Sequence, residues 1–413
     1  MDTLRLSGLH TLTTSIFHAL TARNEVDQLE EIFPFLHSGP GLKHLCISDW
    51  ELVYLSEVHP LTSMYEPKPI CQLESVTLPT STSVGNQNFL CKLVATGNLS
   101  QLRSLDIGSL GDARILVSVA GLFPNLKRLF ISLDARMWNF EKYKHCKSLF
   151  FQDSTAGILA FRPLEYLSIK GLDSVENLNS IIQHHGPSLK GLALVPHDII
   201  YEYPRLHLSD LLEMAILCPN LEELRLQIKR SMGSQEECEM YKAFGTFPNL
   251  QILFLDLDFD ARSRLPSPPN FETENLDDLR QTFINAAMDE KLAFQIWKTI
   301  KNKDSGLRDL RLLPFGNRVF AHEERLLICC FARSWLLTSY NLEYPGLLVI
   351  EQIGKRAWEV KRAKKYPDWE PCLTERMASV VHNIWPQVPG YSDWWTCWTS
   401  LPLQPDDCLP DEH

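Results

Sequence analysis

One apolar motif recurs along most of this chain and restricts its fold more than any other feature. The motif is L-x-x-L-x-L, with leucine, isoleucine or valine at positions 1, 4 and 6. Most successive copies are 24 to 32 residues apart, and two gaps are longer. Self-similarity at such a period indicates stacked structural repeats. Nine complete copies begin at Leu42, Leu73, Leu102, Leu126, Leu164, Leu189, Leu221, Leu250 and Leu307.

The periodicity changes within each repeat. The motif itself alternates apolar and polar residues, as a half-buried β-strand does. Between copies the apolar spacing becomes helical, as at residues 89–94, 115–122, 175–182 and 208–216. A proline ends the helix shortly before the next strand, for example in Phe123-Pro124-Asn125. One repeat is therefore predicted to be one strand and one helix.

A single strand–helix unit cannot bury its own apolar stripe, so neighbouring units stack and their strands pair in parallel. The spacing of the copies is close to that of leucine-rich repeats. The sequence therefore predicts an α/β leucine-rich-repeat solenoid over residues 1–320. Its curved parallel sheet is expected on the concave side and its helices on the convex side.

The two ends of the array depart from this pattern. Residues 2–6 resemble the second half of a further strand, so either residues 11–32 fold back as a cap or a native segment precedes this chain. An irregular insertion with two helices is expected at about 260–305. Residues 321–402 hold seven tryptophans, six of them at 358–398, and are expected to form a mostly helical C-terminal cap. Residues 403–413 are expected to be a disordered acidic tail.

Charge and composition argue against several classes of protein. The formal net charge is -11, which disfavours a general nucleic-acid binder because phosphate binding depends on Lys and Arg. No signal-peptide pattern opens the chain, and the longest apolar run, residues 326–337, is interrupted by Arg333 and too short to cross a bilayer. None of the 11 cysteines forms a C-x-x-C pair, which favours free thiols in a reducing compartment. We therefore expect a cytoplasmic or nuclear protein with no membrane partner.

Motifs for catalysis or cofactor binding are missing from the sequence, which contains no G-x-x-x-x-G-K-[ST], G-x-G-x-x-G or G-x-S-x-G. His184-His185 and Cys329-Cys330 are adjacent pairs whose side chains diverge, so a shared metal is not expected. The basic run in residues 355–365 is interpreted as a solvated helix face, with a nuclear-import or nucleic-acid patch as the alternative. The tryptophans are interpreted as cap packing, with base or sugar stacking as the alternative. We expect no enzyme, no cofactor and no metal.

Several short segments resemble one known family. Phe-Pro-Asn-Leu or Cys-Pro-Asn-Leu opens three motif copies, and INAAMDEKLA follows at 284–293, before Trp385-Pro386 and Trp394-Trp395. These segments resemble the F-box/leucine-rich-repeat proteins of filamentous fungi. In that family the repeats hold a substrate while an N-terminal F-box docks on a Skp-type adaptor of a cullin ubiquitin ligase. No L-P-x-E-[IL] segment precedes the first strand, so a Skp-type adaptor and a cullin are expected only if an F-box is encoded upstream.

The turns that follow the strands share no common residue. The ninth position of each copy, often Asn or Cys in such families, lacks a repeated asparagine. The polar groups of these turns are therefore expected to be satisfied irregularly. The residues at this position are Trp50, Ser81, Leu110, Asp134, Leu172, His197, Lys229, Asp258 and Phe315.

Positions 3, 5 and 7 of each copy are expected to point out of the concave face. Small residues dominate there at first, whereas arginine and aromatic residues, which are favoured as interface anchors, become commoner from Arg128 onward. The alternative is that these are ordinary solvated side chains. The predicted protein-binding residues are Arg128, Phe130, Tyr166, Lys170, Glu223, Arg225, Phe254, Asp256, Asp309 and Arg311.

Together these patterns predict a protein-binding leucine-rich-repeat module. The resemblance implies that it is the substrate-recognition part of an F-box-type ubiquitin-ligase adaptor. The alternative is a stand-alone interaction scaffold with no link to ubiquitin. An enzyme comes third, since no motif supports it.

Overall fold

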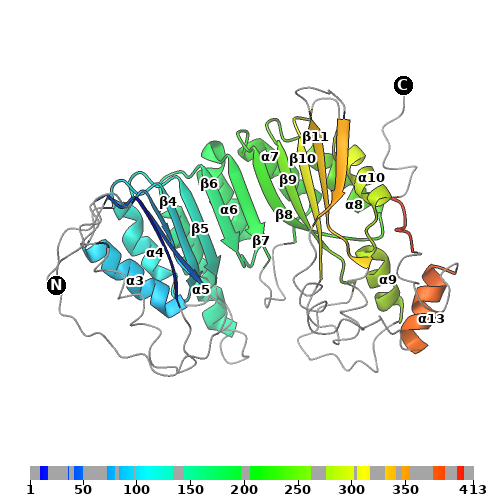
Figure 1. Cartoon of the computed structure of the whole chain (residues 1–413), viewed down its shortest axis with the longest axis horizontal. Coiled ribbons are helices and arrows are strands. Elements are labelled where there is room, and N and C mark those ends of the chain that lie inside the picture. Colours follow the sequence, from blue (N-terminus) through cyan, green and yellow to red (C-terminus); the bar gives the residue numbers. More distant parts are fainter. Residues whose placement is uncertain are drawn as a thin grey trace. The chain divides into compact units, whose positions relative to one another are not determined.

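The computed structural model describes the core strands and helices of the chain, and it divides into two compact units, residues 1–204 and 205–413. Both units are α/β, and in each the strands lie side by side (Figure 1). The described residues are 10–16, 36, 41–49, 72–79, 83–96, 99–133, 144–196, 205–261, 276–301, 305–316, 331–340, 347–353, 375–386 and 398–403.

The first unit has seven strands, and each strand after the first pairs in parallel with the one before it. Helices follow the strands, and α4 contacts α5, which contacts α6. The strands are β1 (Thr11–Ile16), β2 (His44–Asp49), β3 (Ser75–Thr77), β4 (Ser104–Leu110), β5 (Arg128–Leu133), β6 (Tyr166–Lys170) and β7 (Gly191–Val195). The helices are α3 (Ser83–Thr96), α4 (Arg114–Val119), η1 (Ala120–Leu122), α5 (Lys144–Leu159), α6 (Val175–His185) and η4 (Gly186–Ser188).

In the second unit three parallel strands are continued by two antiparallel ones. Helices α7 and α8 contact each other, as do α8 and α10, and α9 and α13. The strands are β8 (Glu223–Lys229), β9 (Ile252–Asp258), β10 (Asp309–Phe315), β11 (Trp335–Tyr340) and β12 (Leu347–Gln352). The helices are α7 (Leu208–Leu217), α8 (Gln235–Phe244), α9 (Leu276–Ala286), α10 (Glu290–Ile300) and α13 (Glu375–Ile384).

The apolar motif places all nine of its strands correctly. Each of β2 to β10 begins at the third residue of one motif copy. Every side chain at positions 1, 4 and 6 is at most 8% exposed. Burial of a side chain such as leucine contributes about 1.5–3 kcal/mol, so the repeated motif supplies much of the force that holds the strands together.

The helices predicted from apolar spacing are confirmed as α3, α4, α6 and α7. The predicted insertion also contains its two helices, α9 and α10. Side chains cap the N-termini of α6 and α10, where the first backbone N–H groups of a helix otherwise have no partner. Ser174 accepts the N–H of Asn177 before α6, and Asp289 accepts the N–H of Leu292 before α10. The stretch that was one of the two alternatives for the N-terminal end, a cap at residues 11–32, begins with strand β1, in register with β2. Residues 2–6 and 17–32 lie outside the described part of the chain.

An asparagine does satisfy one of the turns, but from an unexpected place. Asn86 of α3 is buried, and its Nδ2 donates to the carbonyls of Pro79 at 2.6 Å and Ile107 at 2.9 Å. These two carbonyls belong to the chain after β3 and to β4. The predicted irregular satisfaction is therefore confirmed here, and the amide comes from the following helix rather than from the turn.

The C-terminal region is not mostly helical in its described part, which corrects the prediction. It starts with the antiparallel pair β11 and β12, of which β11 pairs with β10. In β11, Trp335 and Leu337 are buried while Leu336 and Thr338 are half-buried, which is the alternation of a strand. Antiparallel neighbours need only a short connection, so these strands require no repeat motif of the kind that marks the parallel ones.

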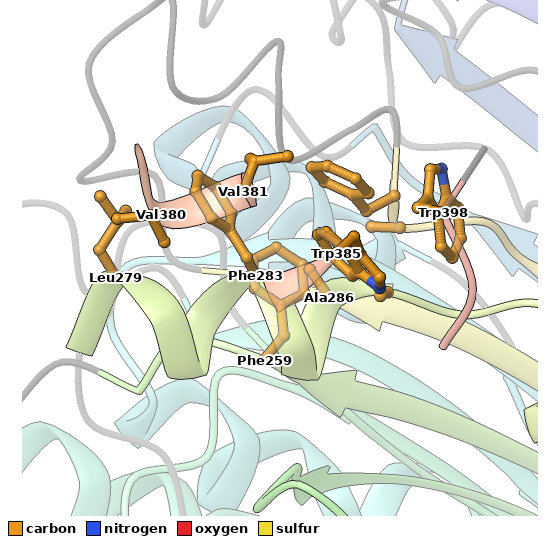
Figure 2. Packing of buried hydrophobic residues seen from close by; sticks show 11 residues of the cluster. Phe259, Leu279, Phe283, Ala286, Val380, Val381, Trp385 and Trp398 are labelled. Atoms are coloured by element: carbon orange, nitrogen blue, oxygen red, sulfur yellow. The ribbon is translucent and has the colours of Figure 1, made fainter. Parts of the chain in front are cut away.

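Two tryptophans of this region pack in an apolar cluster with α9 and α13 (Figure 2). The ring of Phe331 stacks on Trp385 with centroids 4.9 Å apart and lies edge-on to Trp398 at 5.4 Å. The indole N–H of Trp385 donates to the carbonyl of Thr399 at 2.7 Å. The packing interpretation is confirmed for Trp385 and Trp398, whereas Trp358, Trp369, Trp394 and Trp395 lie outside the described residues. The cluster is Phe259, Leu279, Phe283, Ala286, Ala287, Phe331, Ala332, Val380, Val381, Trp385 and Trp398.

Two further expectations concern membranes and thiols. No helix in the described ranges combines the length and apolar character needed to cross a bilayer. Cys46, Cys91 and Cys218 are free, as expected. Cys238, which is buried in α8, is instead disulfide-bonded. The spacing of cysteines in the sequence did not predict this bond because pairing depends on proximity in the fold.

Candidate functional site

The face of the strands opposite the buried motif positions carries the candidate residues. Because the parallel strands are in register, residues at the same motif position lie side by side and form rows across neighbouring strands. We call the face that carries positions 3, 5 and 7 the outer face. The ten predicted binding residues all occur on outer faces, four on β5 and β6 of the first unit and six on β8 to β10 of the second.

In the first unit an arginine stacks on an aromatic ring. Arg128 on β5 and Tyr166 on β6 are aligned, and the guanidinium carbon of Arg128 lies 4.5 Å from the centre of the Tyr166 ring. On its other side Tyr166 lies against Gly191 of β7. A Cβ added at Gly191 would be 2.5 Å from Cδ1 of Tyr166, so a glycine is required for this ring position. Gly191 thus shapes the site, although nothing in the sequence indicated that a glycine is needed at this position.

Next to this stack the outer face is lined by small residues. Phe130, Ser168 and Ala193 are aligned across β5, β6 and β7. Phe130 remains 37% exposed because its neighbour Ser168 is too small to cover it. We call Arg128, Phe130, Tyr166, Ser168, Gly191 and Ala193 the β5–β7 patch. It combines an exposed cation, two aromatic rings and a floor of small side chains.

The second unit repeats the arginine–aromatic stack and adds a carboxylate. Arg225 on β8 is aligned with Phe254 on β9, and its guanidinium carbon lies 4.2 Å from the centre of the Phe254 ring. The same guanidinium donates from Nε and Nη2 to the two carboxylate oxygens of Asp256, at 2.8 and 3.0 Å. Such a bidentate pair fixes the arginine in one orientation. Arg225 is therefore a rigid part of this surface.

The charged residues around the second stack differ in how far they are exposed. Arg311 on β10 is aligned with Phe254 and is exposed, and no ion pair to it occurs among the described residues. Two residues earlier on the same strands, Glu223 and Asp309 are both aligned with Ile252. Glu223 is exposed and Asp309 is half-buried. We call Glu223, Arg225, Phe254, Asp256, Asp309 and Arg311 the β8–β10 patch.

Asp256 is a positioning group rather than an accessible one. Its residue is 0% exposed, and both of its carboxylate oxygens are held by Arg225. Burial raises the pKa of Asp256, while the hydrogen bonds and charge of Arg225 act in the opposite direction. In this conformation Asp256 holds Arg225 and offers no oxygen to a partner.

Residues that the sequence analysis did not select continue this polar surface. Gln227 is aligned with Asp256 and is 6% exposed, and among the residues that the structure describes neither atom of its amide has a hydrogen-bond partner. One row further, Lys229 pairs with the buried Asp258 at 3.2 Å. Strand alternation placed these residues on the outer face, but only the neighbouring strands decide which of them become buried.

The adjacent histidines form structural contacts, not a metal site. Nδ1 of His185 accepts the N–H of Leu164 at 3.2 Å, and its Nε2 lies 3.2 Å from the carbonyl of Ile158. Burial, and to a lesser degree the charge of His184, lower the pKa of His185 to about 4. Within the described ranges no group of three or more His, Cys, Asp or Glu side chains is placed to hold a metal ion. Cys329-Cys330 and the basic run at 355–365 lie outside those ranges.

Comparison with known proteins assigns no family to the chain. Its function therefore has to be inferred from the contacts on the two outer faces. No model of a known protein family matches the sequence, and no curated protein is significantly similar to it.

Proposed function

We propose that this chain is a leucine-rich-repeat solenoid that binds another protein through the outer faces of its strands. The repeat assignment is supported by nine motif copies whose strands all begin at the same motif position. It is also supported by the in-phase parallel pairing of neighbouring copies within each unit. Stacked repeats of this kind offer extended surfaces that suit macromolecular partners.

One observation carries the binding proposal, namely that both units hold an arginine stacked on an aromatic ring on the outer face. These pairs are Arg128 with Tyr166 and Arg225 with Phe254. Arginine and aromatic residues dominate the binding energy of protein interfaces. A stacked side chain is already ordered, so little conformational entropy is lost when a partner binds.

The experiment is a selection of binding peptides with the purified chain, followed by substitution on both sides of the sheet. Phe130→Ala and Arg311→Ala change the outer face, whereas Glu213→Ala and Ile216→Ala change exposed positions of helix α7. We expect the outer-face variants to weaken binding about tenfold or more, as loss of interface anchors does, and the α7 variants to leave it unchanged. Loss of binding in the α7 variants alone would place the interface elsewhere and refute the proposal.

The resemblance to F-box/leucine-rich-repeat proteins supports a narrower form of the proposal. In that form the bound protein is a ubiquitylation substrate, and this chain is the recognition part of a ligase adaptor. Mapping the 5′ end of the native transcript tests this link. An in-frame F-box upstream of Met1, together with co-purification of a Skp-type adaptor, would support it. A transcript that starts at Met1 and a chain that binds no such adaptor would leave the stand-alone scaffold.

A further inference from the structure

The two arginine–aromatic stacks share one geometry and differ in one group. In the second unit Arg225 is aligned with Phe254, and Asp256 lies two residues further along the same strand. The carboxylate of Asp256 accepts two hydrogen bonds from Arg225. The second unit thus shows where an anion sits relative to an arginine that is stacked in this way.

In the first unit the equivalent position holds no anion. Arg128 is aligned with Tyr166, and two residues further along β6 stands Ser168. Serine is shorter and carries no charge, so it cannot neutralise Arg128. The guanidinium is exposed, and no carboxylate pairs with it among the residues that the structure describes.

In the row of aligned residues that contains Ser168, an acid lies on the far side of Phe130. Asp106 of β4 is aligned with Phe130, and Phe130 is in turn aligned with Ser168. Oδ1 of Asp106 accepts the N–H of Gly108 at 3.0 Å, which engages this carboxylate in its own strand. Strand β4 therefore places no carboxylate next to Ser168.

The surroundings of Ser168 leave room for a side chain from outside. Ser168 is half-buried and lies between Phe130, which is 37% exposed, and Ala193. The ring of Tyr166 lies in the space that a side chain at position 191 would fill, and the guanidinium of Arg128 stacks on this ring. An arginine held in this way is well suited to bidentate recognition of a carboxylate.

We propose that Arg128, Tyr166 and Ser168 form a carboxylate-binding site for an aspartate or glutamate side chain of the protein partner. The partner's carboxylate lies beside Arg128 in the same way that the carboxylate of Asp256 lies beside Arg225. It accepts two N–H groups of Arg128 and the hydroxyl of Ser168. Phe130 contacts an apolar residue next to that acid. This inference rests on the proposed function, because it names the chemistry of the partner that the outer face of the first unit binds.

The test introduces a carboxylate into the proposed site by substitution. Ser168→Asp places a carboxylate at the position equivalent to Asp256, where it can pair with Arg128 and exclude the partner's acid. Ser132→Asp is the matched control, because it adds the same charge at a half-buried outer-face serine of β5 that is aligned with Lys170. Peptides selected on the native chain are measured against both variants and against Arg128→Gln. Each peptide is also made with its acidic residue replaced by the amide.

We expect the selected peptides to be rich in Asp or Glu next to an apolar residue. Ser168→Asp, Arg128→Gln and the amide peptide should each weaken binding about tenfold or more, as loss of one partner of a hydrogen-bonded charge pair does. Ser132→Asp should change it less than about threefold. Thermal unfolding of Ser168→Asp should match or exceed that of the native chain, which shows that lost binding is not lost folding.

The outcomes separate this inference from the proposed function. If outer-face peptides bind without an acid, or if Ser168→Asp and Ser132→Asp weaken them equally, the carboxylate site is wrong while the protein-binding proposal stands. If no selected peptide depends on any outer-face residue, both are wrong. If acetate alone competes as well as the acidic peptides at equal concentration, the site is a simple anion site and the partner assignment falls.

Discussion

At the scale of single residues, the folding of the first unit depends on glycines and buried polar groups that have no apolar pattern. Gly108 follows Asp106 in β4 with a φ of +64°, where β4 shifts register against β5. A positive φ is a conformation that side-chain-bearing residues rarely adopt. This single position lets the strand bend past the chain that follows β3.

Gly108→Ala is expected to destabilise the first unit by about 2 kcal/mol or more, from backbone strain and overpacking. The added Cβ would lie 2.1 Å from the carbonyl oxygen of Pro79, so the backbone must move. Gly121→Ala is the control, since nothing lies within 4 Å of its added Cβ. Denaturant unfolding of both variants measures the difference. Equal stability of the two would show that β4 tolerates the change.

The buried His185 predicts a dependence of stability on pH. Its pKa is lowered to about 4 in the folded chain, from about 6.5 when it is exposed. The unfolded chain therefore binds more protons between pH 6.5 and 4, so stability is full above pH 6.5 and decreases as the pH falls through this window. The loss approaches about 3 kcal/mol below pH 4.

Unfolding free energies of the native chain and of His185→Gln, measured from pH 8 to pH 4, isolate this effect. Carboxylates that titrate in the same range contribute equally to both proteins, so the difference between the two curves reports His185. The native curve should fall more steeply below pH 6.5. Parallel curves would mean that His185 is not buried in its neutral form.

At the scale of elements, the turn between β8 and α8 is organised around one buried carboxylate. Glu237 is 2% exposed and lies 2.7 Å from Nε of the buried Arg230. It accepts the N–H groups of Ser231 at 2.6 Å and Gly233 at 3.0 Å, and the hydroxyl of Tyr241 at 2.8 Å. The carboxylate thereby joins the strand end, the turn and the helix.

Glu237→Ala is expected to destabilise the second unit by about 3–5 kcal/mol, because the charge of Arg230 would remain buried without its partner. Glu236→Ala removes an exposed neighbouring acid of the same helix and should change stability by less than about 0.5 kcal/mol. Chemical denaturation compares the two variants. A small effect of Glu237→Ala would show that water reaches Arg230.

At the scale of the whole molecule, the chain has two compact units that each bury their own core. In the second unit a C-terminal segment completes that core. Trp398 packs on Phe331, the N–H of Ser400 donates to Asp289 at 3.1 Å, and the N–H of Leu403 donates to Gln295 at 3.2 Å. The segment therefore ties the apolar cluster to the start and middle of α10.

Trp398→Ala is expected to destabilise the second unit by about 3–5 kcal/mol, as loss of a buried aromatic side chain does. Amide hydrogen exchange should then become faster in α9, α10 and α13 and stay unchanged in β4 to β6. Leu401→Ala changes a 39% exposed neighbour and serves as the control. Faster exchange throughout both units would show that they unfold as one.

Features that depend on neighbouring residues could be predicted from the sequence, whereas strands that depend on distant partners could not. The motif placed nine strands, and the helical spacing placed six helices, because both patterns record which face of a local element is buried. The outer-face rows were also predictable, and with them Arg128, Tyr166, Arg225 and Phe254. The strands β11 and β12 were not predicted, because they carry no repeat motif and pair with partners that only the fold brings near.

The sequence by itself determined the period of the repeat, the buried face of each strand and the side chains that point outward, since alternation and spacing are properties of neighbouring residues. Only the tertiary structure decided how those outward side chains combine. It stacked Arg128 on Tyr166 over Gly191, buried Asp256 against Arg225, and left Ser168 where the first unit lacks such an acid. The physical reason is that these contacts join side chains of adjacent strands about 25 to 40 residues apart in sequence, so each depends on the size and charge of neighbours that only the strand pairing brings beside it.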